Sequence, residues 1–156
     1  MTSKTIIKVS GTILVNKDAG SVFGFFADPA NDQVWRTEIN KSILDGALQA
    51  GVTVSEYSNL SKKASNNLQE LHCVQFDKNT SAIFETPGGA TFYLKSQRMV
   101  KAVSDNTTEV IYHLEFDKSI VKFAIGFSLP DFIISLKAKS DMKKYLRQLK
   151  DHLESV

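Results

Sequence analysis

The chain has 156 residues, of which 42% are hydrophobic and 23% are charged, as is ordinary for one globular domain. Its formal net charge of +2, with lysines scattered among acids, argues against a nucleic-acid binder, which usually carries a concentrated basic stripe. The single Cys73 excludes an internal disulfide, and no apolar run reaches the length of a membrane span. We therefore expect one cytoplasmic domain over residues 1–156, large enough to bury a core without disulfides or metal.

The N-terminal part begins with a predicted strand and continues into two predicted short helices. Residues 6–15 alternate apolar and polar side chains, which is typical of a strand and unlike the continuous apolar stretch of a signal peptide. Asp18 is placed to cap a helix, and the Asp-Pro pair at 28–29 ends that helix because the residue before proline avoids helical geometry. A second short helix over residues 31–36 would contain Trp35.

From residue 38 to residue 117 the sequence predicts a succession of short strands. Polar or glycine-containing turns separate them, at 46–51, 61–67, 77–79, 87–89 and 104–106. Short strands joined by such turns favour an antiparallel meander over parallel crossovers. The last strand alternates clearly, so one of its faces is predicted to be buried. That face carries Val110, Tyr112, Leu114 and Phe116. The buried face of the preceding strand would also carry Ser96 and Arg98.

The C-terminal region is predicted to be one long helix. Ser128 with Asp131 three residues on resembles a capping box, with Pro130 in the first turn. Two apolar stripes follow, and at 100° per residue they point roughly 140° apart. The offset predicts either a kink near residues 138–141 or different partners for the two halves of the helix. The upstream stripe is Leu129, Phe132, Ile133 and Leu136, and the downstream stripe is Met142, Tyr145, Leu146, Leu149 and Leu153.

This order of elements resembles the START-like, or Bet v 1-like, superfamily (SRPBCC), and most closely its polyketide cyclase/dehydrase and lipid-transport branch. The resemblance rests on the opening motif with Val22-Phe23, Ala27-Asp28-Pro29, Asn31 and Trp35, and on the spacing of Gly51, Gly88-Gly89 and the final LRQLKDHLE. It implies an α+β helix-grip fold, in which a seven-stranded curved antiparallel sheet wraps around the long C-terminal helix, with two short helices after the first strand. It also implies a cavity between sheet and helix, roofed by the upstream half of the helix.

Members of this superfamily bind lipids, sterols, polyketides, plant hormones or flavonoids, and a minority are enzymes. The favoured hypothesis is therefore a protein that binds or carries a small hydrophobic ligand, whether lipid, polyketide-like or aromatic, without a cofactor. No HxxxH or CxxC spacing occurs, which argues against a dedicated metal site. Arg98 and Tyr112 are the candidate polar anchors that would orient the ligand. The predicted lining comprises Phe26, Trp35, Phe84, Phe92, Leu94, Arg98, Tyr112, Leu114, Phe132, Ile133 and Leu136.

A second hypothesis is a polyketide cyclase or dehydratase that works without metal. Strand alternation would bring Glu56, with Glu70 or His72, onto the concave face beside Arg98 and Tyr112. Arg98 would then stabilise an enolate, and His72 or Glu70 would move the proton. The plainer interpretation is that Arg98 pairs with Glu70 or Glu56 and only satisfies polar atoms in a wet cavity. Each assignment depends on strand register, since a one-residue slip reverses it.

A third hypothesis is a protein-interaction module like the co-chaperone members of the superfamily. A collapsed cavity together with an exposed apolar patch would favour it over ligand binding. The composition allows such a collapse, because the chain contains 10 Phe residues that would be able to fill the interior.

Overall fold

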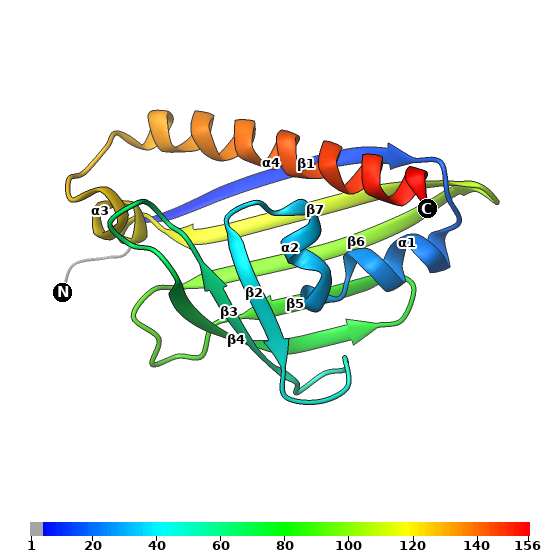
Figure 1. The fold of residues 1–156 in the computed structure, drawn as a ribbon, viewed down its shortest axis with the longest axis horizontal. Helices are drawn as coiled ribbons and strands as arrows, with labels where there is room; N and C mark the ends of the chain where they lie inside the picture. Colours follow the sequence, from blue (N-terminus) through cyan, green and yellow to red (C-terminus); the bar gives the residue numbers. More distant parts are fainter. Residues whose placement is uncertain (1–4) are drawn as a thin grey trace.

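The computed structural model describes residues 5–156, so the first four residues of the expected 1–156 domain lie outside it. The described residues form a seven-stranded antiparallel sheet and a long C-terminal helix (Figure 1). The strands are β1 (Ile6–Val15), β2 (Ile39–Leu44), β3 (Thr53–Ser58), β4 (Asn67–Asp77), β5 (Ser81–Glu85), β6 (Leu94–Ser104) and β7 (Thr107–Asp117). The helices are α1 (Ala19–Phe26), the 3-10 turn η1 (Pro29–Asn31), α2 (Asp32–Trp35), α3 (Ser119–Ile125) and α4 (Asp131–Ser155).

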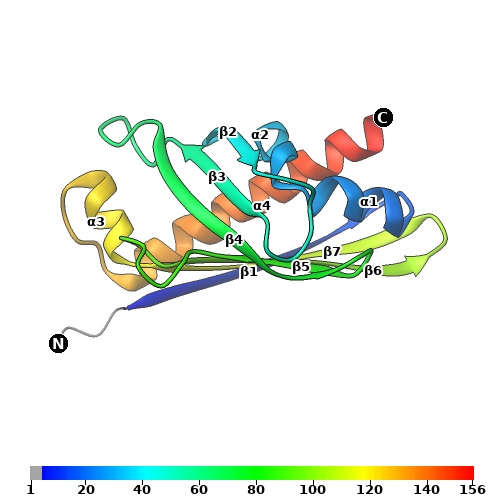
Figure 2. The same cartoon turned by 90° about the horizontal axis from the view of Figure 1, so that it is seen from below.

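The strand order β1-β7-β6-β5-β4-β3-β2 is that of a meander in which β1 joins the last strand. Figure 2 shows the sheet curving around α4, which runs along its concave side. The short helices α1 and α2 lie near the C-terminal half of α4, whereas α3 lies at the opposite end. The α+β helix-grip prediction, with seven strands and two short helices after the first strand, is confirmed.

The start and the end predicted for the first helix are both observed. Asp18 caps α1 by accepting a hydrogen bond from the Ser21 backbone N–H at 2.9 Å. Asp28 caps η1 in the same way, through the Ala30 N–H at 3.0 Å. Side-chain caps of this kind satisfy backbone donors that have no partner inside the helix. For this reason Asp18 correctly predicted the start of α1.

The predicted capping box at the start of α4 is wrong. Pro130 is the N-cap residue, and no side chain caps the helix. Asp131 instead forms an ion pair with Lys118 at 2.5 Å, which ties the start of α4 to the end of β7. The preceding helix α3 was not predicted; it buries Ile120 and Ala124 one turn apart and ends at Gly126, whose φ of 88° suits glycine.

The two apolar stripes of α4 have different surroundings. This agrees with one of the two alternatives predicted from the sequence, that the two halves of the helix have different partners. α4 is one helix of 25 residues. Its downstream residues Met142, Leu146, Leu149 and Leu153 are each 3% exposed or less and belong to the main core. Upstream, only Ile134 is buried, and Ile133 is partly exposed.

Gly11 in β1 lets α4 approach the sheet closely. A Cβ at this position would lie 2.9 Å from Leu146 Cδ1 and 2.9 Å from Met142 Sδ, closer than these atoms tolerate. We expect Gly11→Ala to lower the free energy of unfolding by about 1–3 kcal/mol, since it overpacks the interface. Gly24→Ala in α1 is the control, because nothing lies within 4 Å and helical alanine stabilises by about 0.5–1 kcal/mol relative to glycine. Urea denaturation measures both; equal effects would contradict the close-approach role.

Candidate functional site

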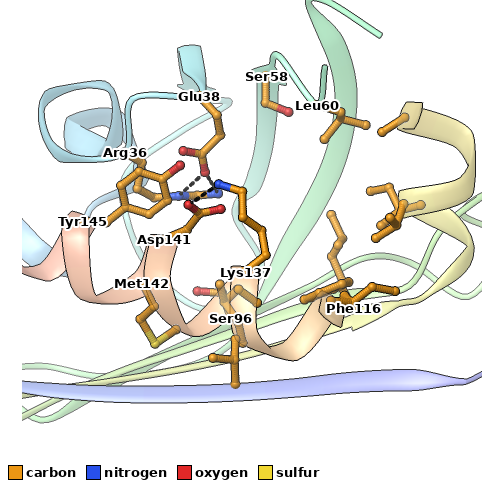
Figure 3. Close-up of a pocket in the computed structure, with 18 of the residues that line it drawn as sticks. Arg36, Glu38, Ser58, Leu60, Ser96, Phe116, Lys137, Asp141, Met142 and Tyr145 are labelled. Atoms are coloured by element: carbon orange, nitrogen blue, oxygen red, sulfur yellow. Dashed lines mark hydrogen bonds and ion pairs between the residues drawn. The ribbon is translucent and has the colours of Figure 1, made fainter. Parts of the chain in front are cut away.

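A pocket of about 750 Å³ lies between the sheet, α3 and α4 (Figure 3). Most of its wall is aliphatic, from strands on one side and from α3 and α4 on the other. Representative wall residues are Leu71, Leu94, Leu114, Ile120, Ile134 and Met142. The cavity has therefore not collapsed, and the phenylalanines do not fill it.

Arg36 forms the polar end of the pocket, and the sequence reasoning did not include it. Its guanidinium donates hydrogen bonds to Asp32 Oδ2 at 3.0 Å, Glu38 Oε1 at 3.1 Å and Glu56 Oε2 at 3.2 Å. Burial by itself lowers the pKa of Arg36, but the surrounding carboxylates, Glu56 foremost, more than offset this and hold the pKa well above its usual value. Arg36 is thus a permanent cation whose donors point at carboxylates.

The side chains of α4 complete this end of the pocket from the opposite side. Figure 3 shows Lys137, Asp141 and Tyr145 on α4 facing Arg36 and Glu38. Lys137 Nζ donates to Asp141 Oδ1 at 2.7 Å, one helical turn away. Burial raises the pKa of the Tyr145 hydroxyl, and the neighbouring Glu38 raises it further, so this phenol stays protonated.

Arg98 is buried and does not line the pocket. Its Nη1 and Nη2 donate to the two carboxylate oxygens of Asp32 at 2.7 and 2.6 Å, and Nη1 also donates to the Phe26 carbonyl at 2.9 Å. Nε donates to Ser96 Oγ at 3.2 Å. The predicted anchor is therefore closed off, and its partner is Asp32 rather than Glu70 or Glu56. Strand register had no means of finding this partner, because Asp32 is on α2.

The predicted lining residues divide into three groups. Those that line the pocket are Leu94, Tyr112, Leu114 and Ile133. Phe26, Trp35 and Phe84 are instead in the core, where with Tyr112 they surround the Arg98 guanidinium at 5.4–5.9 Å. Their aromatic faces suit a buried cation, which explains why they gather there.

The remaining predicted lining residues also lie away from the pocket wall. Phe92 is buried beside Phe123 of α3, with ring centroids 5.3 Å apart. Phe132 and Leu136 are 67% and 64% exposed. They are one turn apart on α4, on a helix face that the core residues do not share, so placing them in the roof of the cavity was an error.

The proposed proton-transfer group is not assembled. The side chains of Glu70 and His72 are 56% and 43% exposed, and they contact each other at 3.1 Å on the outer face of β4. The inner face of β4 carries Gln69, Leu71 and Cys73. Of the carboxylates considered, Glu56 alone faces inward, and it pairs with Arg36.

Three further features of the described chain concern its cysteine, its potential metal ligands and the apolar character of its helices. Cys73 is buried, as expected of a small apolar filler, and burial raises the pKa of its thiol. Within residues 5–156, His, Cys, Asp and Glu side chains form no group of three or more that is arranged to hold a metal ion. No helix in this range combines the length and the apolar character needed to cross a bilayer.

The curved sheet, the long helix and the pocket between them define a START-like, or Bet v 1-like, fold. A START superfamily protein from Mycobacterium smegmatis is similar at a TM-score of 0.74 and 12% identity, over 95% of this chain and 97% of that one. The Zhui aromatase/cyclase from a Streptomyces species follows at 0.70 and 13%, over 96% and 94%. Ara h 8.0201 has a TM-score of 0.62 at 12% identity, over 97% and 100%.

No protein-family model and no curated protein sequence matches this chain. At identities of 12–13%, the structural similarities establish the fold alone. Function therefore has to be argued from the residues of the pocket.

Proposed function

We propose that this protein binds a small hydrophobic ligand in the pocket between the sheet and α4. The observation that carries the proposal is an uncollapsed pocket of about 750 Å³ with mostly aliphatic walls and one polar end. Ligand sites commonly measure about 300–1,000 Å³ and combine apolar walls with a few polar groups. Each Å² of apolar surface buried would contribute roughly 25 cal/mol to affinity.

The placement of this chain's own residues, rather than its structural neighbours, favours binding over a cyclase mechanism built on Arg98. One neighbour carries the name aromatase/cyclase and another is named only as a START superfamily protein, so the fold does not decide between the two functions. In this chain, however, Arg98 is enclosed by Asp32, and Glu70 and His72 lie on the opposite face of the sheet. The groups proposed for proton transfer do not converge, whereas the cavity needed for binding is present.

Native mass spectrometry of the purified protein, followed by denaturing extraction, tests the proposal directly. We expect a stoichiometric apolar compound to co-purify, or an apo protein whose thermal unfolding temperature rises with added apolar ligands. A protein that is empty and unresponsive to a panel of lipids, alcohols and aromatic compounds would contradict the proposed function.

Filling the pocket should abolish binding without unfolding the protein. Ala138 lies on the pocket wall in α4 and is only half-buried, so Ala138→Trp would place a large ring in the cavity. We expect at least a tenfold loss of affinity for any ligand found, with the unfolding temperature nearly unchanged. Lys139→Trp is the control, since residue 139 is exposed on the same helix and does not line the pocket. Equal losses of ligand affinity in the two variants would indicate that the ligand binds outside this pocket.

A further inference from the structure

The buried polar end of the pocket contains more carboxylates than cations. The guanidiniums of Arg36 and Arg98 are surrounded by three carboxylates, those of Asp32, Glu38 and Glu56. One formal negative charge is therefore left over in a region largely shielded from water, since the side chains of Asp32, Glu56 and Glu38 are 0%, 10% and 23% exposed, and charges interact more strongly there than at the surface.

The lysines at the pocket rim do not cancel this excess at depth. Lys137 is paired with Asp141 on the same helix, and its side chain is 75% exposed. Lys144 is exposed, and its ammonium lies over the Tyr145 ring at 5.6 Å. Lys95 on β6 is paired in register with Glu85 of β5 and Glu115 of β7. Solvent screens such charges, so the field inside the pocket is set mainly by the buried cluster.

Arg36 has no donor to spare for an acidic ligand. Its Nε donates to Glu38, its Nη1 donates to Asp32 and Glu56, and its Nη2 lies 3.0 Å from Glu38 Oε1 and 3.5 Å from Glu56 Oε1. A carboxylate or phosphate entering this end would displace one of these partners. It would also meet two carboxylates of the same sign, which is unfavourable in a desolvated site.

Two buried oxygens at the same end have no hydrogen-bond partner among residues 5–156. Tyr112 is 1% exposed and lines the pocket, and its hydroxyl has no hydrogen-bond partner within residues 5–156. Glu38 Oε2 is likewise buried and makes no hydrogen bond of ordinary geometry within residues 5–156, and the Tyr145 hydroxyl is the donor of α4 that lies beside this carboxylate. Buried polar atoms are normally satisfied, and a carboxylate oxygen can only accept. Glu38 Oε2 therefore calls for a donor, whereas the Tyr112 hydroxyl is able to accept from that donor and to donate to a polar atom of the same ligand.

We propose that the ligand carries a hydrogen-bond donor, preferentially a cationic amine, at the end of an apolar body. This inference rests on the proposed ligand-binding function and specifies its ligand class. The ammonium lies against Glu38 and Glu56, within reach of the Tyr112 hydroxyl, and neutralises the excess charge. The apolar body lies along the aliphatic wall formed by Leu71, Leu114 and Ile134.

Three ligands with the same chain and different head groups test this proposal. Dodecylamine, dodecanol and dodecanoate are titrated at pH 7, each below its solubility limit or micelle concentration, against the neutral fluorescent probe N-phenyl-1-naphthylamine. We expect dodecylamine to bind most tightly and dodecanoate at least tenfold more weakly than dodecylamine. Dodecanoate binding as tightly as dodecylamine, or more tightly, overturns the proposal. Failure of the probe and of all three ligands to bind contradicts the proposed function itself, so the two failures are distinguishable.

Variants that remove one negative charge test whether the carboxylates near Arg36 cause the preference for an amine. Glu38→Gln and Glu56→Gln each keep the side-chain shape and remove one negative charge, so we expect amine affinity to fall about tenfold and dodecanol affinity to change little. Glu70→Gln, on the outer face of β4, is the matched control and should change neither affinity. Circular dichroism verifies folding, and if Glu56→Gln is unfolded then Glu38→Gln alone decides. Equal losses for amine and alcohol overturn the ionic role.

Discussion

Replacing Asp32 with alanine is expected to lower the free energy of unfolding by about 3–5 kcal/mol. Asp32 is fully buried and accepts hydrogen bonds from both Arg98 and Arg36. Its removal leaves two guanidiniums, one of them 2% exposed, without the carboxylate that they share. The penalty arises from uncompensated charge in a water-poor interior rather than from the lost pair itself.

Urea denaturation, extrapolated linearly to water, measures the effect of Asp32→Ala. Asp28→Ala is a matched control in the neighbouring residues, since it removes only the cap of η1 and should cost about 0.5–2 kcal/mol. Adding Arg98→Met to Asp32→Ala should recover part of the loss, because Arg98 is the cation left without a carboxylate, whereas Arg36 keeps Glu38 and Glu56. A loss in Asp32→Ala no larger than that in Asp28→Ala would contradict the role of Asp32 as the centre of the network.

The sequence predicted the sheet well where alternation was unambiguous. On β6 and β7 the inward residues Ser96, Arg98 and Tyr112 are buried as expected. In these strands a single register places apolar residues together on one face, so only that register buries the core. The architecture as a whole followed from such strands and from the turns between them.

The register of β4 was mispredicted for a physical reason visible in its own residues. Leu68 and Val74 are apolar on one face, and Leu71 and Cys73 are apolar on the other, so either face was a candidate for burial. In the structure Leu71 and Cys73 face the core, and Leu68 and Val74 are about half exposed. His72 shares the outer face with them. The sequence alone contained no signal that decided between these faces.

The candidate site was mispredicted because its charged residues come from the short segment that follows α1 as well as from strands. Asp32 on α2 and Arg36 and Glu38 immediately after it reach Glu56 on β3. No alternation rule applies to a four-residue helix or to a connecting segment. One signal was present in the sequence, since three charged residues within seven positions flank Trp35 in a region otherwise expected to be buried.

Trp35→Ala should destabilise the unliganded protein by about 3–5 kcal/mol, as expected for a large side chain in the core. Trp35 is fully buried, with its ring centroid 5.5 Å from that of Tyr112 and 5.7 Å from that of Phe26. The Arg98 guanidinium lies 5.7 Å from the same ring. Truncation therefore opens a cavity beside a buried cation, so packing and cation–π contacts are lost together.

This result separates a core tryptophan from one that lines the pocket, which was the prediction for Trp35. Truncating a residue that only lines the pocket would change ligand affinity and leave the stability of the unliganded protein nearly intact. Phe132→Ala supplies the comparison, because that ring is 67% exposed and its loss should change stability by less than about 0.5 kcal/mol. Urea denaturation without ligand measures both variants. Similar free energies of unfolding for Trp35→Ala and Phe132→Ala would contradict the assignment of Trp35 to the core and of its ring as a cation–π partner of Arg98.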